Sequence, residues 1–107
     1  MSIDVFESAI QPAGHFGAVF ERADLTAFFY LLDLRMGQGG EIVATVNVQT
    51  ETEMAPAAAA RIAWAAQGDL VGLFLEESLC AVFDLTDPAA ARAPSPTDLQ
   101  RLSLKKH

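Results

Sequence analysis

The segment 27–32, Ala27-Phe28-Phe29-Tyr30-Leu31-Leu32, restricts the fold more than any other part of the sequence. Its aromatic and aliphatic residues predict a β-strand. Side chains alternate along a strand, so one face carries Ala27, Phe29 and Leu31, and the other carries Phe28, Tyr30 and Leu32. Both faces are apolar, whereas a strand in an open single sheet keeps one face in water. The segment therefore needs cover on both sides, from the chain's own second layer, a ligand or another copy of the chain.

Most of the remaining sequence also predicts short strands separated by turns. Residues 16–22 and 25–34 form one predicted hairpin, and residues 70–76 and 79–85 form another. A weaker strand signal lies at Ile3 and Val5. In residues 41–50 the alternation predicts one buried face with Ile42, Ala44, Val46 and Val48. In residues 79–85 the predicted shared face carries Leu79, Ala81, Phe83 and Leu85, and Cys80 is expected to pack in the core.

Two segments bear on whether the fold contains helices. Residues 56–67 are rich in alanine and favour a helix by propensity, but Ile62 and Trp64 alternate with their neighbours as in a strand. Both readings stay open on these grounds. Near the C-terminus, Ser95 is placed to cap a helix, with Pro96 in its first turn and Asp98 as the reciprocal acid.

The length of 107 residues indicates a single domain, 1–107. We expect a β framework over 1–87, followed by an Ala/Pro-rich linker and C-terminal helix or tail over 88–107. The predicted fold is mainly β: an antiparallel sheet of about six or seven short strands, barrel-like or two-layered, with a short C-terminal helix. The alternative is an α+β fold with an extra helix at 56–67.

Charge and cysteine content restrict the partners and the compartment. The net charge is −7, with five scattered arginines and two lysines at the C-terminus. Without a basic stripe, binding to nucleic acid is not expected, and an anionic membrane would repel the protein. A basic protein partner would be attracted. The single cysteine forms no internal disulfide and the N-terminus lacks a signal peptide, so the sequence predicts a cytoplasmic protein.

The order of several motifs resembles a known family. Residues 15–21 read HFGAVFE, residues 27–33 AFFYLLD, residues 62–68 IAWAAQG and residues 81–84 AVFD. Together they resemble a small single-domain bacterial family of unknown function. The resemblance implies that Ile62 and Trp64 lie on a strand and that Gln67-Gly68 forms a hairpin turn. It implies no catalytic or binding residue.

The search for chemistry finds no complete catalytic or metal-binding group. One cysteine and two histidines spell out no zinc cluster, and no cofactor is expected. Candidate ligand-binding residues are His15, Tyr30 and Asp33, and candidate interface residues are Phe28, Tyr30 and Leu32. We therefore expect a non-enzymatic protein-interaction module that self-associates as a dimer. The alternative is a small-molecule-binding or catalytic β-barrel with its mouth near His15, Tyr30 and Asp33.

Overall fold

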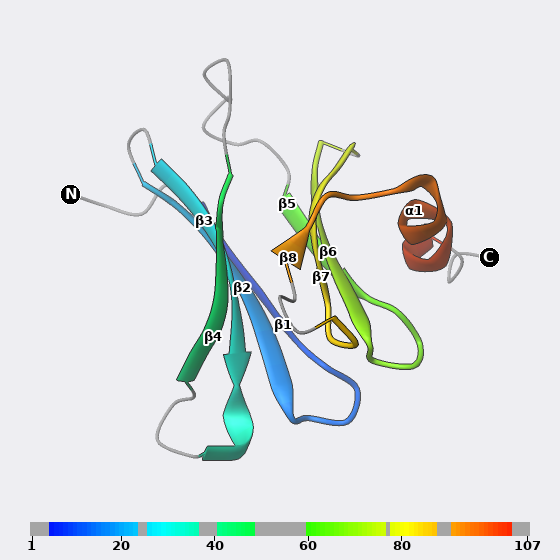
Figure 1. Ribbon diagram of the computed structural model, residues 1–107. Coiled ribbons are helices and arrows are strands. Elements are labelled where there is room, and N and C mark those ends of the chain that lie inside the picture. Colours follow the sequence, from blue (N-terminus) through cyan, green and yellow to red (C-terminus); the bar gives the residue numbers. More distant parts are fainter. Residues whose placement is uncertain are drawn as a thin grey trace.

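The computed structural model describes residues 5–23, 26–36, 41–48, 60–76, 78–87 and 91–103. These residues form two antiparallel sheets that face each other, with one helix on the outside of the second sheet (Figure 1). Sheet A has the order β1-β2-β3-β4, with β1 (Val5–Ile10), β2 (Phe16–Ala23), β3 (Thr26–Asp33) and β4 (Glu41–Asn47). Sheet B has the order β5-β6-β7-β8, with β5 (Ala60–Trp64), β6 (Leu70–Leu75), β7 (Ser78–Asp84) and β8 (Ala91–Arg92). A 3₁₀ turn, η1 (Leu34–Met36), follows β3, and helix α1 (Pro96–Ser103) follows β8.

The predicted mainly β fold with a short C-terminal helix is confirmed. Of its two forms the two-layer arrangement is correct, because the sheets stay separate and do not close into a barrel. The α+β alternative is wrong where it can be judged: residues 60–64 form β5, which pairs with β6. Residues 56–59 of that alternative, and Ile3 of the weak N-terminal strand signal, lie outside the described residues.

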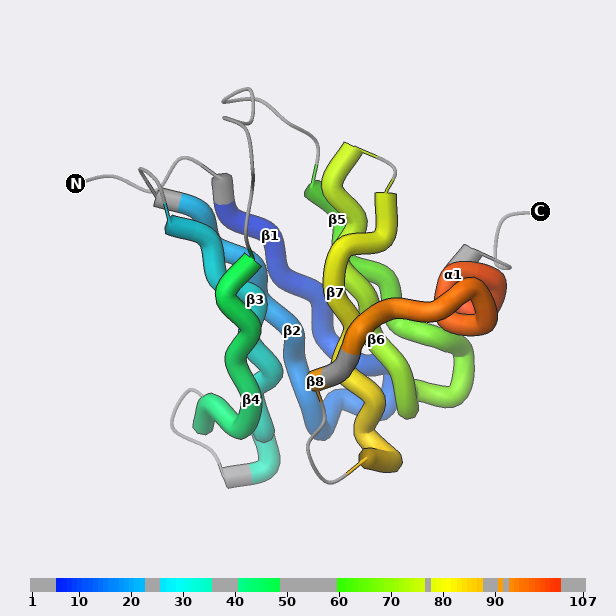
Figure 2. The backbone as a smooth tube through the Cα atoms, turned by 45° about the horizontal axis from the view of Figure 1, so that its top comes forward, coloured from blue at the N-terminus to red at the C-terminus, as the bar shows by residue number. Residues whose placement is uncertain are grey.

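The two sheets form two layers (Figure 2), and the main apolar core is made of residues from both. Sheet A contributes Ala18, Phe20, Ala27, Phe29 and Leu31, and sheet B contributes Val71, Leu73, Leu75, Ala81 and Phe83. The rings of Phe29 and Phe83 stack across the layers with their centroids 4.7 Å apart. Such aromatic contacts add to the free energy gained from burying apolar area. One face of the segment 27–32 is thus covered by the chain's own second layer.

Helix α1 covers the outer side of sheet B. Leu102 is 1% exposed and belongs to a second apolar cluster with Leu70, Phe74 and Val82. The helix approaches so closely at Gly72 that a Cβ there would lie 2.5 Å from Leu102 Cδ1. The predicted cap is confirmed, because the Ser95 N–H donates to Asp98 Oδ2 at 2.9 Å and the Asp98 N–H donates to Ser95 Oγ at 3.3 Å.

Two β-bulges change the faces of the sheets on which some of the predicted core residues lie. Between β3 and β4, Leu31 pairs with Ala44 but Leu32 pairs with Ile42, so Val43 is an extra residue. Ile42 is 54% exposed, and its prediction as a buried residue is wrong because the bulge interrupts the alternation. Ala44 and Val46 pack against the core, and Val48 belongs to it, as the alternation predicts.

The second bulge lies between β6 and β7. Leu73 pairs with Ala81 but Phe74 pairs with Leu79, so Cys80 is the extra residue. The expectation that Cys80 packs in the core is wrong, because the residue is exposed. Leu79 does not share the inner face of Ala81 and Phe83; it packs with the cluster under helix α1. The inserted residue therefore reverses the faces of the sheet on which the side chains of the first part of β7 lie.

The two sheets are joined along the side where β1 approaches β5. The indole Nε1–H of Trp64 donates to the Ala9 carbonyl at 3.1 Å, and the Gln11 side-chain amide donates to the Gly68 carbonyl at 2.7 Å. Trp64 is half-buried at this seam. In the described part of the chain, no helix has the length and apolar character needed to cross a membrane.

Candidate functional site

The candidate site is the outer side of sheet A, which we call the open face. Strand alternation sets its composition, because the alternate residues of β2 and β3 point into the core. The pairing registers align its residues in rows across the strands, such as Phe6–Glu21–Phe28–Asn47 and Ser8–Val19–Tyr30–Thr45. The open face carries Phe6, Ser8, Ile10, Gly17, Val19, Glu21, Phe28, Tyr30, Leu32, Ile42, Thr45 and Asn47.

The open face is largely apolar and exposed. Ile10 is 65% and Phe6 is 54% exposed, while Val19, Phe28, Tyr30 and Leu32 are half-buried by their neighbours. Figure 1 shows that helix α1 lies on sheet B, on the opposite side of the molecule. Leu34 of η1 lies at one end of this face, beside Gly17. Contiguous exposed apolar surface of this kind commonly marks an interaction site.

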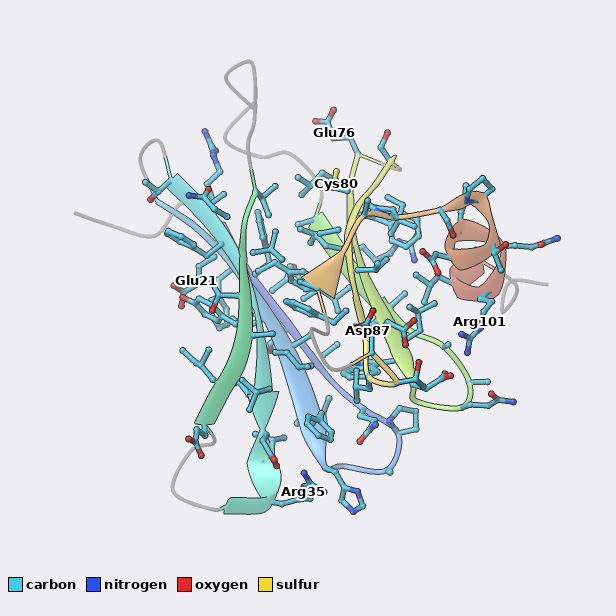
Figure 3. All side chains as sticks on the ribbon, viewed as in Figure 1. Glu21, Arg35, Glu76, Cys80, Asp87 and Arg101 are labelled. Atoms are coloured by element: carbon cyan, nitrogen blue, oxygen red, sulfur yellow. The ribbon has the colours of Figure 1, made fainter. Side chains whose placement is uncertain are left out.

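One carboxylate lies within the open face. The Tyr30 hydroxyl donates a hydrogen bond to Glu21 Oε1 at 2.6 Å across strands β2 and β3. This bond, together with partial burial and the nearby charge of Glu21, raises the pKa of Tyr30 to about 12. Glu21 points away from sheet B (Figure 3). The remaining residues of the open face are uncharged.

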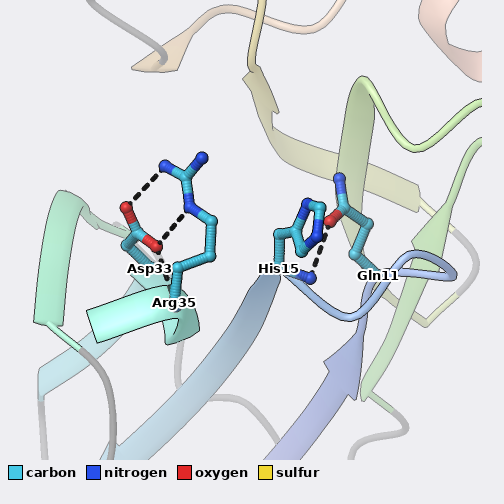
Figure 4. A network of polar contacts seen from close by, with 4 residues as sticks. All are labelled: Gln11, His15, Asp33 and Arg35. Atoms are coloured by element: carbon cyan, nitrogen blue, oxygen red, sulfur yellow. Dashed lines mark hydrogen bonds and ion pairs between the residues drawn. The ribbon is translucent and has the colours of Figure 1, made fainter. Parts of the chain in front are cut away.

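A separate polar group lies at the end of sheet A where β1 joins β2 and β3 meets η1 (Figure 4). Arg35 binds Asp33 with two side-chain bonds, from Nε at 2.9 Å and from a terminal nitrogen at 2.8 Å. These bonds, and one from the Arg35 backbone N–H, lower the pKa of Asp33 to about 2. The guanidinium of Arg35 also lies over the Phe16 ring, 5.0 Å from its centroid. The His15 backbone N–H donates to Gln11 Oε1 at 3.1 Å.

The structure brings together some of the predicted residues and separates others. His15 and Asp33 lie at the same end of sheet A, close enough for the charge of His15 to lower the pKa of Asp33 further. Tyr30 lies on the open face, whereas Asp33 pairs with Phe16 and follows the inward alternation of β3. Phe28, Tyr30 and Leu32 share the open face, as the alternation of segment 27–32 indicates.

Sequence reasoning missed three residues that shape these sites. Phe6 and Ile10 extend the open face over β1, but Glu7 and Ser8 between them hide the strand pattern. Arg35 is a single arginine after a strand, and only its position two residues beyond Asp33 could have indicated the ion pair. The signal for β1 would have been the even spacing of Phe6 and Ile10, which places both side chains on one face of a strand.

The remaining features offer little for chemistry. Partial burial raises the pKa of the Cys80 thiol, which donates to the Ser78 carbonyl at 3.4 Å, so Cys80 is not an activated nucleophile. An open hollow of about 460 Å³ lies between β7 and the start of α1, and is lined by Ser78, Leu79, Pro94, Ser95, Pro96 and Leu99. Across the described ranges, no three histidine, cysteine or carboxylate side chains gather as metal ligands would.

Comparison with protein families gives one match. Residues 3–106 match a family model described as an uncharacterised protein conserved in bacteria, DUF2251. The chain belongs to this family. The match confirms the predicted resemblance to a small bacterial family of unknown function. Neither the curated proteins nor the solved structures contain a match to this DUF2251 chain.

Proposed function

We propose that this DUF2251 protein is a non-enzymatic protein-interaction module that self-associates through the open face. The observation that carries the proposal is the contrast in cover: helix α1 shields the outer side of sheet B, while Phe6 and Ile10 on sheet A remain more than half exposed. Exposing such side chains to water is unfavourable by about 25 cal/mol for each Å² of apolar surface. A second copy of the same face would remove that surface from water.

The composition of the open face supports a protein partner of the same kind. The centres of protein interfaces are rich in aromatic residues and poor in charge. The open face contains Phe6, Phe28 and Tyr30 and a single carboxylate, Glu21, in a chain of net charge −7. Two copies that meet through this face keep most of their like charges apart. An acidic surface elsewhere would limit contacts in other orientations.

The size of the open face suggests a weak dimer. Strands lie about 4.8 Å apart and rise about 3.3 Å per residue, so four strands of about six paired residues give a footprint of roughly 400 Å². That area is typical of the largest apolar patches on monomers and about half of what each partner buries in a standard stable interface. We therefore expect association that depends on protein concentration in the micromolar range.

The single cysteine supports a reducing, cytoplasmic setting.

The geometry gives less support to a catalytic or ligand-binding barrel near His15, Tyr30 and Asp33. The two sheets are open, and Tyr30 points to a different side from Asp33. The carboxylate of Asp33 is bound by Arg35, and a pKa of about 2 makes it a weak general base. We therefore favour the interaction module.

The test compares two substitutions that add the same charge. Ile10→Glu places a carboxylate on the open face, and Leu99→Glu places one on α1, where Leu99 is 43% exposed. Both positions are open to water, so both variants should fold. Sedimentation velocity over a wide concentration range should show a monomer–dimer equilibrium for the wild type and for Leu99→Glu. In Ile10→Glu the dissociation constant should rise by about tenfold or more, because a charge would be buried.

Two results would contradict the proposal. The first is a wild-type protein that stays monomeric up to millimolar concentration. The second is an equal loss of association in both variants, which would show that added negative charge acts through the whole molecule. Circular dichroism and urea unfolding of each variant would confirm that the comparison concerns folded protein.

A further inference from the structure

Glu21 is the single charged residue among those that define the open face, and it lies between two phenylalanines. Phe6 pairs with Glu21 from β1, and Phe28 pairs with it from β3. The Glu21 side chain is half-buried and lies on the side of sheet A that faces away from sheet B (Figure 3). The Tyr30 hydroxyl donates to its Oε1 at 2.6 Å. A carboxylate is thus set among apolar side chains on the surface that we propose for self-association.

The residues around Glu21 place no cation beside it on the open face. Tyr30 faces Glu21 from β3, and its pKa of about 12 keeps the hydroxyl protonated throughout the range in which carboxyl groups titrate. The neighbours on β1 and β4 that share this face are uncharged: Phe6, Ser8, Thr45 and Asn47. Two charged residues nearby, Glu7 of β1 and Arg22 of β2, lie on the opposite alternation of their strands.

A second copy of the open face would bring no cation either. In a twofold-symmetric dimer both copies present the same residues. The partner therefore adds another glutamate and none of the basic residue types to the interface. Covering the face removes water from the carboxylate, and burial disfavours the charged form of a carboxyl group. A neutral carboxyl group can instead donate to a hydroxyl oxygen, which Ser8 and Thr45 offer on the same face.

We infer that Glu21 makes the self-association of this protein depend on pH, because each copy takes up a proton at Glu21 when the dimer forms. The inference rests on the proposed function, since it requires a second copy on the open face. Its direction follows from linkage: a reaction that takes up protons is favoured as the pH falls. The dimer should therefore be stronger in mildly acidic solution than at neutral pH.

The test measures the dissociation constant of the full chain by sedimentation velocity at about pH 7.5 and about pH 5.5. For the wild type the constant should be at least about tenfold lower at the more acidic pH. The amide of Glu21→Gln has no charge at either pH. This variant should therefore associate at least about tenfold more tightly than the wild type at the higher pH, and about equally at both.

Glu7→Gln is the matched control, because it removes one negative charge from the opposite alternation of β1. Glu7 is exposed, and its replacement should change the dissociation constant by less than about twofold. Histidine protonation also lowers the net negative charge over this pH range. Salt separates the two causes, because it screens repulsion between acidic surfaces but does not return water to a buried carboxylate. The pH dependence of the wild type should therefore persist in about 0.5 M salt.

Calorimetry of dilution counts the protons directly when it is run in two buffers with different enthalpies of ionisation. Near pH 5.5, dissociation of the wild-type dimer should release between about one and two protons per dimer, from the two copies of Glu21. Dimers of Glu21→Gln should release none. Equal proton release from the two proteins would overturn the inference, because the protons would then come from other groups.

The inference and the proposed function fail in different ways. A wild-type dimer with the same dissociation constant at both pH values would overturn the inference alone. Equal dissociation constants for Glu21→Gln and Glu7→Gln would do the same. A dimer that weakens as the pH falls would show that the charged carboxylate is paired with a cation, which also overturns the inference. Protein that stays monomeric in all three forms at both pH values would overturn the proposed function as well.

Discussion

The outer sides of the two sheets are built alike but are covered differently. On sheet B, Leu70, Phe74 and Val82 are buried beneath Leu102 of α1. Arg61 extends that cover by lying over the Phe74 ring, 4.2 Å from its centroid. On sheet A, no described helix covers the apolar residues, and Phe6 and Ile10 remain exposed. An apolar sheet side that has internal cover contributes to folding, whereas one without it is available to another molecule.

The way α1 attaches explains why it covers sheet B. Leu102 fits over Gly72, the one position of β6 without a side chain. The Arg101 guanidinium binds Asp69 at 2.6 Å, and the two side chains are each about one-third exposed. Such a pair contributes little, about 1 kcal/mol or less. The apolar contact between Leu102 and Gly72 must therefore hold the helix. A substitution at this contact would uncover the outer side of sheet B.

The largest expected effect follows from removing that contact. Leu102→Ala should lower the free energy of unfolding by about 2–3 kcal/mol, because it deletes a fully buried side chain and leaves a cavity against Phe74 and Val82. The control is Leu99→Ala on the same helix, where Leu99 is 43% exposed and the change should cost less than about 1 kcal/mol. Urea unfolding measures both. Equal losses would show that the burial of Leu102 against sheet B is not what makes α1 stabilise the protein.

A pair of glycine substitutions compares the two outer sides directly. A Cβ on Gly72 would lie 2.5 Å from Leu102 Cδ1 and 2.8 Å from Leu79 Cδ1, so both side chains must move. Gly72→Ala should therefore cost about 1–3 kcal/mol. On sheet A, a Cβ on Gly17 would meet Leu34 Cδ1 at 3.5 Å, an ordinary contact.

Gly17→Ala should accordingly be neutral or slightly stabilising, since glycine weakens strands. Thermal and urea unfolding of both variants measure the difference. If Gly17→Ala destabilised the protein as much as Gly72→Ala, the outer side of sheet A would be as tightly covered as that of sheet B. The comparison that underlies the proposed function would then be wrong.

The sequence allowed the strands and the cap to be predicted, but not the bulges. Alternation identified segment 27–32 and the two hairpins, because those residues are paired without insertion for most of their length. The extra residues Val43 and Cys80 each reverse the faces beyond them. Their positions depend on the twist of paired strands, which a single strand's pattern does not contain.

Tertiary pairing also overrode local propensity at β5. Residues 60–64 are rich in alanine and favour a helix in isolation, yet they pair with β6 across its whole length. For the candidate site, alternation indicated that Phe28, Tyr30 and Leu32 share a face. The alternation could also have shown that Tyr30 and Asp33 point to opposite sides of the sheet, because they are three positions apart along the strand. To predict that β1 adds Phe6 and Ile10 to the open face, the order of the strands in sheet A must be known, and the sequence does not give that order.

The smallest expected effect concerns the polar pair within the open face. The pKa of Tyr30 is raised to about 12 by its bond to Glu21. In the unfolded chain a tyrosine titrates near pH 10. The stabilisation from Tyr30 is thus complete below about pH 10 and is lost as the pH rises towards 12, because the unfolded chain releases the proton first.

Glu21→Gln should lower the pKa of Tyr30 towards 10, because the neutral amide accepts a weaker hydrogen bond than the carboxylate and carries no charge that opposes ionisation. Tyr30 is the only tyrosine of the chain, so the near-ultraviolet absorbance of tyrosinate reports on it alone. Glu7→Gln on β1 makes the same charge change on the opposite alternation and should leave the midpoint unchanged. If a second copy covers the open face, the wild-type midpoint should rise with protein concentration, and that rise should be absent in Ile10→Glu. A midpoint independent of concentration in both proteins would show that the pair stays in contact with water, as on a surface without a partner.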